Sequence, residues 1–422
     1  MHSTALSFYA SRSSPFASRP SPYPMKNLPR NVWAVTLTSF LTDVSSEMLA
    51  NVMPLFLSNV LGAPTSIIGL IEGVAETTAS LLKVFSGWLS DKLGQRKWLA
   101  VAGYGLSTIA KPFLLLANSW GWVLGVRFGD RVGKGLRTAP RDALIADSVN
   151  EQQRGFAFGL HRAGDTAGAA LGLLIGLIVI WFTQRADLKL EHSTFNTLVL
   201  ISTVPAVLAV IGLATLARET PLPKERRAAP RLSLAGFDAR FKSFLFIIIL
   251  FTLGNSSDAF LILRAQSVGL PLLGVLGMML TFNIVYAAVS GPAGALSDKI
   301  GRKRLIVGGW LVYGLIYLGF ARVTAGWQAW ALMAVYGLYY ALTEGVAKAF
   351  VADLVPAAQR GTAYGVFNAA IGLMALPASL LAGVLWQGAL GWAGFGPSAP
   401  FYFGAALALI SSGLLIRLRT YI

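Results

Sequence analysis

The sequence predicts an all-α membrane protein with twelve transmembrane helices arranged as two homologous six-helix bundles. Three observations lead to this prediction. First, 55% of the 422 residues are apolar and only 13% are charged, whereas a soluble domain has about 25% charged residues. Second, apolar runs of about twenty residues recur along the chain. Third, several segments of the sequence occur twice at nearly the same separation.

Each apolar run is long enough to cross the ~30 Å hydrocarbon core of a bilayer as a helix. A strand of a transmembrane barrel needs only about ten residues, so the length of the runs favours helices. The runs cover residues 32–60, 67–89, 98–117, 120–146, 155–182, 195–217, 243–266, 271–296, 304–322, 326–352, 361–385 and 398–418.

The distribution of charge predicts the orientation of the chain. The formal net charge of +16 by itself suggests a nucleic-acid partner. However, the basic residues gather in four segments, 1–30, 91–97, 218–242 and 298–304. The loops expected on the other side have no charge or balanced charge. This positive-inside pattern argues against nucleic acid, and it places both termini and the 218–242 segment in the cytoplasm.

The sequence gives no sign of enzyme chemistry. It has no cysteine, which excludes disulfides and thiolate metal ligands, and we expect neither a metal site nor a cofactor. It also has no P-loop motif for ATP. Residues 1–30 lack the apolar core of a secretory signal, so we expect a disordered basic extension. A transit peptide, or a start codon at Met25, would be the alternatives.

The internal repeat divides the chain into two halves. Asp91 and Asp298 are 207 residues apart, and the similar segments 146–159 and 352–365 are 206 apart. "SSE" at 45–47 and "SSD" at 256–258 are separated by 211 residues. We therefore expect bundles at 31–217 and 243–422, joined by a cytoplasmic linker at 218–242. A parallel repeat of this kind places the substrate site between the halves, near the middle of the membrane.

The repeated hairpin resembles a known signature. "SGWLSDKLGQRKW" (86–98) and "AGALSDKIGRKRL" (293–305) are similar to the loop between helices 2 and 3 of the major facilitator superfamily. The resemblance extends over about residues 31–418. It implies a latch on the cytoplasmic side that closes in one conformation only. The residues of this predicted cytoplasmic gate are Gly87, Asp91, Gly94, Arg96, Gly294, Asp298, Gly301 and Arg302.

Many charged residues lie inside the expected spans, where each one costs at least ~2.5 kcal/mol. Ten are basic and nine are acidic, which favours mutual pairing, and fifteen of the nineteen fall in the first half. We therefore place ion coupling and most polar recognition there. The basic residues are Lys83, Lys111, Arg127, Arg131, Lys134, Arg137, Arg141, Arg162, Arg264 and Lys348. The acidic residues are Asp43, Glu47, Glu72, Glu76, Asp130, Asp142, Asp165, Asp258 and Glu344.

The expected helix at 120–146 is the most unusual. At about 100° per residue, Arg127, Arg131, Lys134 and Arg141 share one stripe of its surface. In addition, Arg131-x-x-Lys134-Gly135 resembles the Arg-x-x-Gln-Gly motif of proton-coupled members of the superfamily, with Lys in place of Gln. The resemblance implies that Arg131 sets the pKa of a nearby carboxylate.

We expect Arg131 to pair with one of four first-half carboxylates. Burial raises the pKa of a carboxyl group and a nearby guanidinium lowers it, so a carboxylate that alternates between the two settings can carry a proton. The alternative for each acid is a permanent structural ion pair. The candidates, in order of preference, are Asp43, Glu47, Asp165 and Glu76, and Asp258 and Glu344 join them in the second half.

The expected helix at 155–182 carries glycines at four-residue spacing, at positions 164, 168, 172 and 176, which permits close helix packing. Related drug–proton antiporters have a Gly-Pro pair in this helix, and its absence here argues against drug efflux. His161 is either a proton shuttle or a hydrogen-bonding residue near the cytoplasm.

The remaining polar residues of the spans form the expected substrate cavity. They are Lys111, Arg127, Arg131, Arg162, Asn255, Asn283 and Asn368. Lys348 follows Glu344 by four residues and is expected to pair with it. Trp181, Trp310, Trp327 and Trp330 are interpreted as an interfacial belt.

These features predict a monomeric secondary transporter in a bacterial inner membrane. Its expected partners are a small anionic or zwitterionic organic solute, protons and the lipid bilayer, and it would work by rocker-switch alternating access. Proton-antiport efflux of amphiphilic compounds is one alternative. A non-transporting receptor or assembly factor on the same fold is another, and the two intact latch motifs argue against it.

Overall fold

The computed structural model describes residues 28–184, 187–219, 234, 236–356 and 359–418, which form helices and no named strand. The predicted N-terminal extension and most of the predicted linker lie outside these residues. In the first half the helices are α1 (Arg30–Ala50), α2 (Met53–Leu55), η2 (Phe56–Val60), α3 (Thr65–Leu93), α4 (Lys97–Ala110), η3 (Lys111–Leu116), α5 (Trp120–Ser148), α6 (Glu151–Thr183) and α7 (His192–Leu216).

The second half repeats this order of long helices. It contains α8 (Ala239–Gly254), α9 (Ala259–Ser267), α10 (Leu272–Ile300), α11 (Arg302–Arg322), α12 (Gly326–Leu354), α13 (Arg360–Gln387) and α14 (Ala399–Arg417). Every predicted apolar run coincides with one or more of these helices, so the all-helical prediction is confirmed.

Three of the predicted runs are not continuous α-helices, and here the sequence prediction is corrected. The run 32–60 breaks after α1 and continues through α2 into the π-helical η2. The run 98–117 tightens into the 3₁₀ helix η3, which has Pro112 in its first turn. The run 243–266 is interrupted between α8 and α9 by Asn255–Asp258, whose side chains compete for backbone hydrogen bonds.

Within the described part of the chain, eight helical segments are long and apolar enough to cross a membrane. The helices α1, α3, α5 and α12 are not among these eight segments. Both α3 and α5 contain several of the charged residues described above, which lowers their mean hydropathy. Twelve spans therefore remains a prediction.

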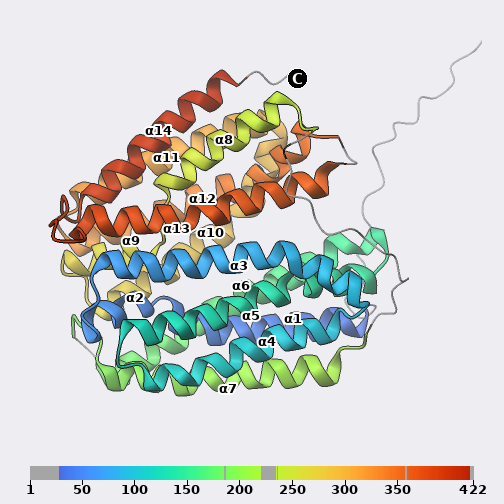
Figure 1. Cartoon of the computed structure of the whole chain (residues 1–422), viewed down its shortest axis with the longest axis horizontal. Helices are drawn as coiled ribbons and strands as arrows, with labels where there is room; N and C mark the ends of the chain where they lie inside the picture. The colour runs from blue at the N-terminus through green and yellow to red at the C-terminus, as the bar shows by residue number, and fades with distance from the viewer. Residues whose placement is uncertain (1–27, 185–186, 220–233, 235, 357–358, 419–422) are drawn as a thin grey trace, which may run out of the picture.

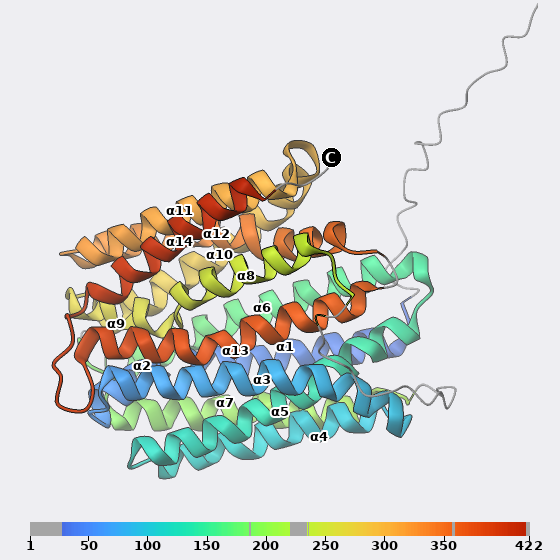
Figure 2. The same ribbon diagram turned by 45° about the horizontal axis from the view of Figure 1, so that its top comes forward.

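The helices pack as two groups that lie against each other (Figure 1). In the first group α1 packs on α6 and α7, while α5 packs on α3 and α4. In the second, α12 packs on α10 and α11, while α14 packs on α8 and α11. The main contacts between the groups are α3 with α13 and α6 with α10, and the turned view in Figure 2 also places α3 beside α13.

Small residues make the close contacts. A side chain at Gly168 or Gly172 of α6 would clash with the backbone of α1, as the glycine spacing predicted, whereas Gly176 meets only Leu276 of α10. Gly372 and Gly383 of α13 approach Ser80 and Thr65 of α3 in the same way.

The two ends of the molecule differ. The end that carries the hairpins 91–97 and 298–304 is here called the basic end, and the other is called the opposite end. At the opposite end the two groups are joined by polar contacts. Thr65 donates from its backbone N–H to Oε1 of Gln387 (2.9 Å) and from its hydroxyl to the carbonyl of Gly383 (3.0 Å). Gln266 donates to the carbonyl of Leu188 (2.7 Å).

Candidate functional site

The charged residues of the first half meet around α5. Gly133 faces α4 and Gly135 faces α3, and any side chain at either position would clash with those helices. These two glycines let three helices approach closely. The basic side chains of α5 then reach the acidic residues of α3 and the polar residues of α4.

The predicted partner of Arg131 is present. Its Nη1 lies 3.4 Å from Oε1 of Glu76 on α3, and its Nε lies 3.4 Å from the neighbouring Asp130. One turn away, Arg127 forms a tight ion pair with Glu72, and both side chains are buried. Removing either member of a buried pair would leave an uncompensated charge, so we interpret the Arg127–Glu72 pair as structural.

Glu76 differs from Glu72 in its exposure. Its side chain is 49% exposed, although it lies in the middle of α3. Lys134 of α5 is also exposed, and it acts electrostatically on both Glu76 and Glu47. On α1, Glu47 accepts a hydrogen bond from the amide of Asn51 at 3.0 Å. Charged residues from α1, α3 and α5 therefore lie within electrostatic reach of one another.

Asp43 lies one turn from Glu47 on α1 and is partly buried. No hydrogen bond or ion pair to it is found among the described residues. The charges that act on it include the carboxylates of Asp165 and Glu47. Asp165 itself lies 3.2 Å from Nδ1 of His161 on α6. Of the four predicted coupling carboxylates, Asp43 and Glu47 have no counter-ion in contact among the described residues, and Glu47 keeps the hydrogen bond from Asn51.

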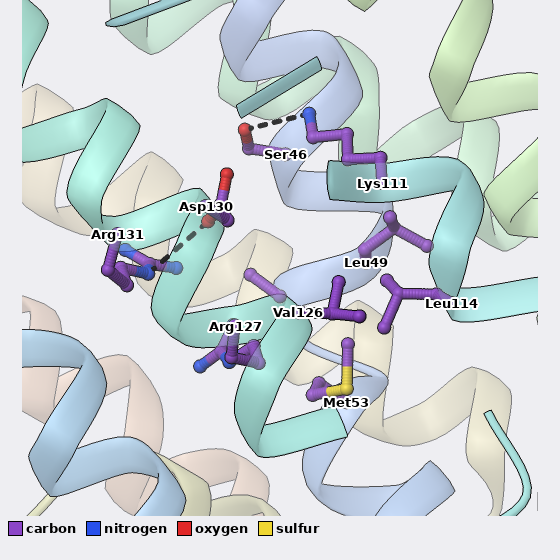
Figure 3. Close-up of a pocket in the computed structure, with 10 residues that line it drawn as sticks. Ser46, Leu49, Met53, Lys111, Leu114, Val126, Arg127, Asp130 and Arg131 are labelled. Carbon is purple, nitrogen blue, oxygen red and sulfur yellow. Dashed lines mark hydrogen bonds and ion pairs between the residues drawn. The ribbon is translucent and has the colours of Figure 1, made fainter. Parts of the chain in front are cut away.

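Lys111 and Arg127, both predicted to line the substrate cavity, border a small pocket of about 40 Å³ (Figure 3). Lys111 Nζ donates to the hydroxyls of Ser45 and Ser46 on α1, and Asp130 and Arg131 also line the pocket. A space of this size holds water rather than an organic solute.

Two further basic residues of α5 also have local partners. Arg137 lies over the ring of Tyr104 at 4.4 Å and donates to Ser107 (2.8 Å), while Arg141 pairs with Asp142 at 2.8 Å.

In the second half the polar site forms at the break between α8 and α9. Tyr313 donates to the carbonyl of Gly254 at 2.9 Å, which satisfies an acceptor at the end of α8. Tyr336 donates to Oδ1 of Asp258 at 2.9 Å. The amide of Asn255 lies 3.5 Å from the hydroxyl of Tyr339. A broken helix of this kind exposes backbone groups that transporters use to bind ions and solutes.

The sequence prediction missed these tyrosines. Tyr313 and Tyr317 of α11 stack at 4.0 Å, and Tyr336, Tyr339 and Tyr340 of α12 pack against each other. Their spacing of three or four residues places each set on one helix face, and that spacing was the available signal. Trp310 was wrongly assigned to the interfacial belt, because it is buried and stacks on Phe251 at 4.4 Å. In contrast, Trp181 and Trp327 are exposed, and Trp330 donates to Thr281 at 3.0 Å.

The two halves interact at two places near the site. Asp258 experiences the charges of Glu47, Glu72 and Glu76 from the first half. Nearer the basic end, Arg162 of α6 donates to the hydroxyl of Tyr286 on α10 (3.1 Å). Tyr286 in turn donates to Glu344 on α12 (2.7 Å).

The residues around this bridge were partly predicted. Lys348 lies 3.4 Å from Glu344, as their spacing indicated. A groove of about 580 Å³ between α6 and α10 is lined by Arg162, Asn283 and Tyr286. Asn368, also predicted for the cavity, is partly buried on α13.

The predicted gate residues of the first copy bind within their own half. Arg96 pairs with Asp91 at 3.1 Å and with Asp147 at the end of α5 at 2.6 Å. The carboxylate of Glu219, which follows α7, accepts the backbone N–H groups of Arg96 and Lys97 at the start of α4. Gly87 packs against Ala139 of α5.

In the second copy Arg302 pairs with Asp353 at the end of α12 at 2.5 Å. The side chain of Asp298 lies outside the described part of the structure, and Gly294 has open space beside it. Gly94 and Gly301 adopt positive φ angles of 65° and 93°, which explains why glycine ends both helices. Among the described residues no group of three or more His, Asp or Glu side chains could hold a metal ion.

The comparisons with known proteins agree with this architecture. The family model of the major facilitator superfamily matches residues 35–282 and 243–421. The chain is 38% identical over 397 residues to an uncharacterized MFS-type transporter of Methanocaldococcus jannaschii, covering 93% of this chain and 95% of the relative. The chain therefore belongs to the major facilitator superfamily. It is an integral membrane transporter and not an enzyme.

Two further matches are more distant. The multi-drug resistance efflux pump PmrA of Streptococcus pneumoniae is 27% identical over 331 residues, covering 76% of this chain and 80% of the pump. The crystal structure of the nucleoside transporter NupG superposes with a TM-score of 0.76 at 14% identity, covering 92% of this chain and all of that one. At this identity the structural match shows the fold alone.

Proposed function

We propose that the protein is a proton-coupled secondary transporter of a small anionic or zwitterionic organic solute, with its substrate site between the two halves. The observation that carries this proposal is the pair of unlike faces that the two halves present. One face presents Lys134 and Glu76, both exposed, and the other presents the broken helix with Asp258 and its tyrosines. A solute with a carboxylate can pair with Lys134, while its remaining part contacts the tyrosine side.

Asp43 is the proposed proton carrier. Two general effects favour the neutral form of a carboxyl group, namely burial and nearby carboxylates. Asp43 is partly buried, the carboxylates of Asp165 and Glu47 act on it, and among the described residues no cation is in contact with it. Arg137 and Lys134 act on it from α5, so a movement of α5 relative to α1 would change how strongly they favour the charged form. Such a change is what a coupled carrier requires.

Alternating access requires that contacts between the halves form and break. The contacts of Thr65 with Gln387 and Gly383 hold the opposite end together. The chain Arg162–Tyr286–Glu344 joins α6, α10 and α12 closer to the basic end. We propose that the two sets open in alternation, since simultaneous opening would leave a leak.

The test begins with the substrate. Purified protein is screened by thermal stabilisation against organic acids, amino acids and cationic drugs at two pH values. The solute that stabilises it is then loaded into reconstituted vesicles. We expect an inward-acid pH gradient to drive accumulation or extrusion. If only a sodium gradient or an opposing solute gradient does so, proton coupling is wrong. If only amphiphilic cations stabilise the protein, the solute class is wrong.

A second candidate is proton-driven efflux of amphiphilic compounds. The similarity to PmrA and the aromatic cluster around Asp258, with Tyr313, Tyr317 and Tyr336, favour it. The same thermal screen separates the candidates, because an efflux pump would be stabilised by aromatic cations and not by organic acids.

We also propose that the basic end faces the cytoplasm of a bacterial cell, that the protein is monomeric, and that 31–217 and 243–422 move as the two halves. The chain has no cysteine, so single-cysteine variants report orientation directly. A membrane-impermeant maleimide should label Leu390→Cys on intact cells and Lys92→Cys only after permeabilisation. The reverse pattern would overturn this topology.

A further inference from the structure

A large basic cavity lies at the basic end of the second half, away from the proposed substrate site. It has a volume of about 960 Å³, and it is formed by the start of α8, the turn between α10 and α11, and the ends of α12 and α14. Figure 1 shows the start of α8 and the end of α14 close together there. Its basic lining residues are Arg240, Lys299, Arg302, Lys303 and Arg304.

Positive charge exceeds negative charge in this cavity. Asp353, which pairs with Arg302, is the acidic residue among the described lining residues. The exposed Asp238 pairs with Arg240 at 2.6 Å. Lys303 donates to the carbonyls of Ile416 and Leu418 and so ties α11 to α14. The side chains of Lys299 and Arg304 are exposed.

Part of the cavity lining, here called the apolar floor, is apolar. Val307, Phe350, Leu354 and Ile416 make up this part. Ile416 is 58% exposed, and Ile300 beside it is 41% exposed. A basic rim over an apolar floor matches a molecule whose charged head is attached to an apolar body.

The internal repeat supplies an independent argument. At the equivalent place in the first half, the start of α4, the carboxylate of Glu219 accepts the N–H groups of Arg96 and Lys97. The helix equivalent to α4 is α11, whose start at Arg302 and Lys303 lines the basic cavity. The first half therefore places one of its own anions where the second half has a basic cavity.

We propose that this cavity binds a phosphate group, supplied by the headgroup of an anionic phospholipid in the cytoplasmic leaflet. Basic pockets between helices on the cytoplasmic side suit such headgroups. The apolar floor would accommodate the start of the acyl chains. The proposal rests on the orientation proposed above and is independent of the transported solute. The bound lipid would hold α8, α11, α12 and α14 together. In the first half Glu219 has a similar role, because it joins the end of α7 to the start of α4.

The test measures lipid binding to the detergent-purified protein by native mass spectrometry. The probes are phosphatidylglycerol, cardiolipin, phosphatidylcholine, glycerol 3-phosphate and inorganic phosphate. We expect the two anionic lipids to bind more tightly than phosphatidylcholine. The double variant Lys299→Gln/Arg304→Gln should weaken their binding about 30-fold, since each basic residue near a membrane surface contributes about fivefold.

The matched control is Lys242→Gln combined with Lys92→Gln. Both residues are exposed near the basic end and lie outside the cavity, so this variant should bind as the unmodified protein does. The charge-preserving variant Lys299→Arg/Arg304→Lys should also retain binding, which separates loss of charge from misfolding. Equal weakening in the cavity variant and the control would overturn the proposal, as would equal binding of phosphatidylglycerol and phosphatidylcholine.

The soluble probes distinguish the source of the phosphate. If glycerol 3-phosphate or inorganic phosphate competes at the concentrations that saturate the lipid, the site takes a soluble phosphate and the lipid assignment is wrong. Transport is not measured in this experiment. A failure here therefore leaves the proposed transport function standing, and a failure of proton coupling leaves the lipid site standing.

Discussion

The equivalent helices α5 and α12 do different work in the two halves. Asp130 of α5 corresponds to Tyr336 of α12 at the 206-residue offset, and Lys134 corresponds to Tyr340. In the first half these positions belong to a network of charges on α5 and α3, in which Arg131 pairs with Asp130 and Glu76 and Lys134 acts on Glu76. In the second half they form a tyrosine cluster around a broken helix. One fold therefore holds a charged face and an aromatic face. This difference indicates that the same helix packing is compatible with different residue types on the inner surface.

Substitutions in the ion-pair network and in the tyrosine cluster should change the free energy of unfolding by different amounts. A buried ion pair depends on both partners, because the loss of one leaves a charge in a medium of low polarity. A tyrosine hydroxyl that loses its acceptor is still a mostly apolar ring. We expect substitutions in the first half to have larger effects than equivalent ones in the second.

The largest effect is expected at Asp43. Asp43→Asn should abolish uphill transport while leaving exchange of the solute between equal concentrations intact, because only the coupled step needs the proton. Uptake and exchange are measured in reconstituted vesicles with the solute found by thermal screening. Asp258→Asn is the comparison in the second half and should retain coupling. If the Asp43→Asn variant still carries out coupled transport, Asp43 is not the proton carrier.

The next effect is expected at the buried pair of Arg127 and Glu72. Arg127→Met should destabilise the protein by about 3–5 kcal/mol, and Arg127→Met/Glu72→Leu by much less. The melting temperature in detergent reports both. The matched variant is Arg264→Met, since buried Arg264 donates to the carbonyls of Phe320 and Val323 and to the hydroxyl of Ser267 and forms no ion pair among the described residues. It should cost about 1–3 kcal/mol. Equal losses from both single variants would contradict the distinction between the halves.

A smaller effect is expected at Tyr336. Tyr336→Phe removes the hydrogen bond to Asp258 and should cost about 1–3 kcal/mol, which is the cost of an unsatisfied buried acceptor. Tyr317→Phe is the control, because no hydrogen-bond partner of its hydroxyl is found among the described residues. It should leave the melting temperature unchanged. If the two variants behave alike, the hydrogen bond to Asp258 does not hold the broken helix.

The smallest effect is expected at the bridge between the halves. Tyr286→Phe breaks the link between Arg162 and Glu344 and should shift the balance of conformations by about 0.5–1.5 kcal/mol. The shift is measured as the change in maleimide labelling of a cysteine placed at Ala163, in the groove beside α10. Unchanged labelling would show that the bridge does not distinguish the conformations.

The sequence alone determined much of the fold. Apolar runs located every long helix, because burial in lipid is a property of residue composition over about twenty positions. The repeat located the two halves, and the glycine spacing of α6 located its contact with α1. The charged residues near the site were also found individually, since charges in apolar runs stand out.

Only the tertiary structure decided which of these residues meet. Arg127 and Glu72 are 55 residues apart, and their contact depends on the rotation of two helices and on the glycines between them. The same holds for the tyrosine cluster, whose members come from α11 and α12, and for the break at Asn255, which other helices stabilise. Periodicity fixes the face of each helix on which a side chain lies. Which residues of another helix lie opposite that face depends on packing between distant segments. No local pattern in the chain predicts this.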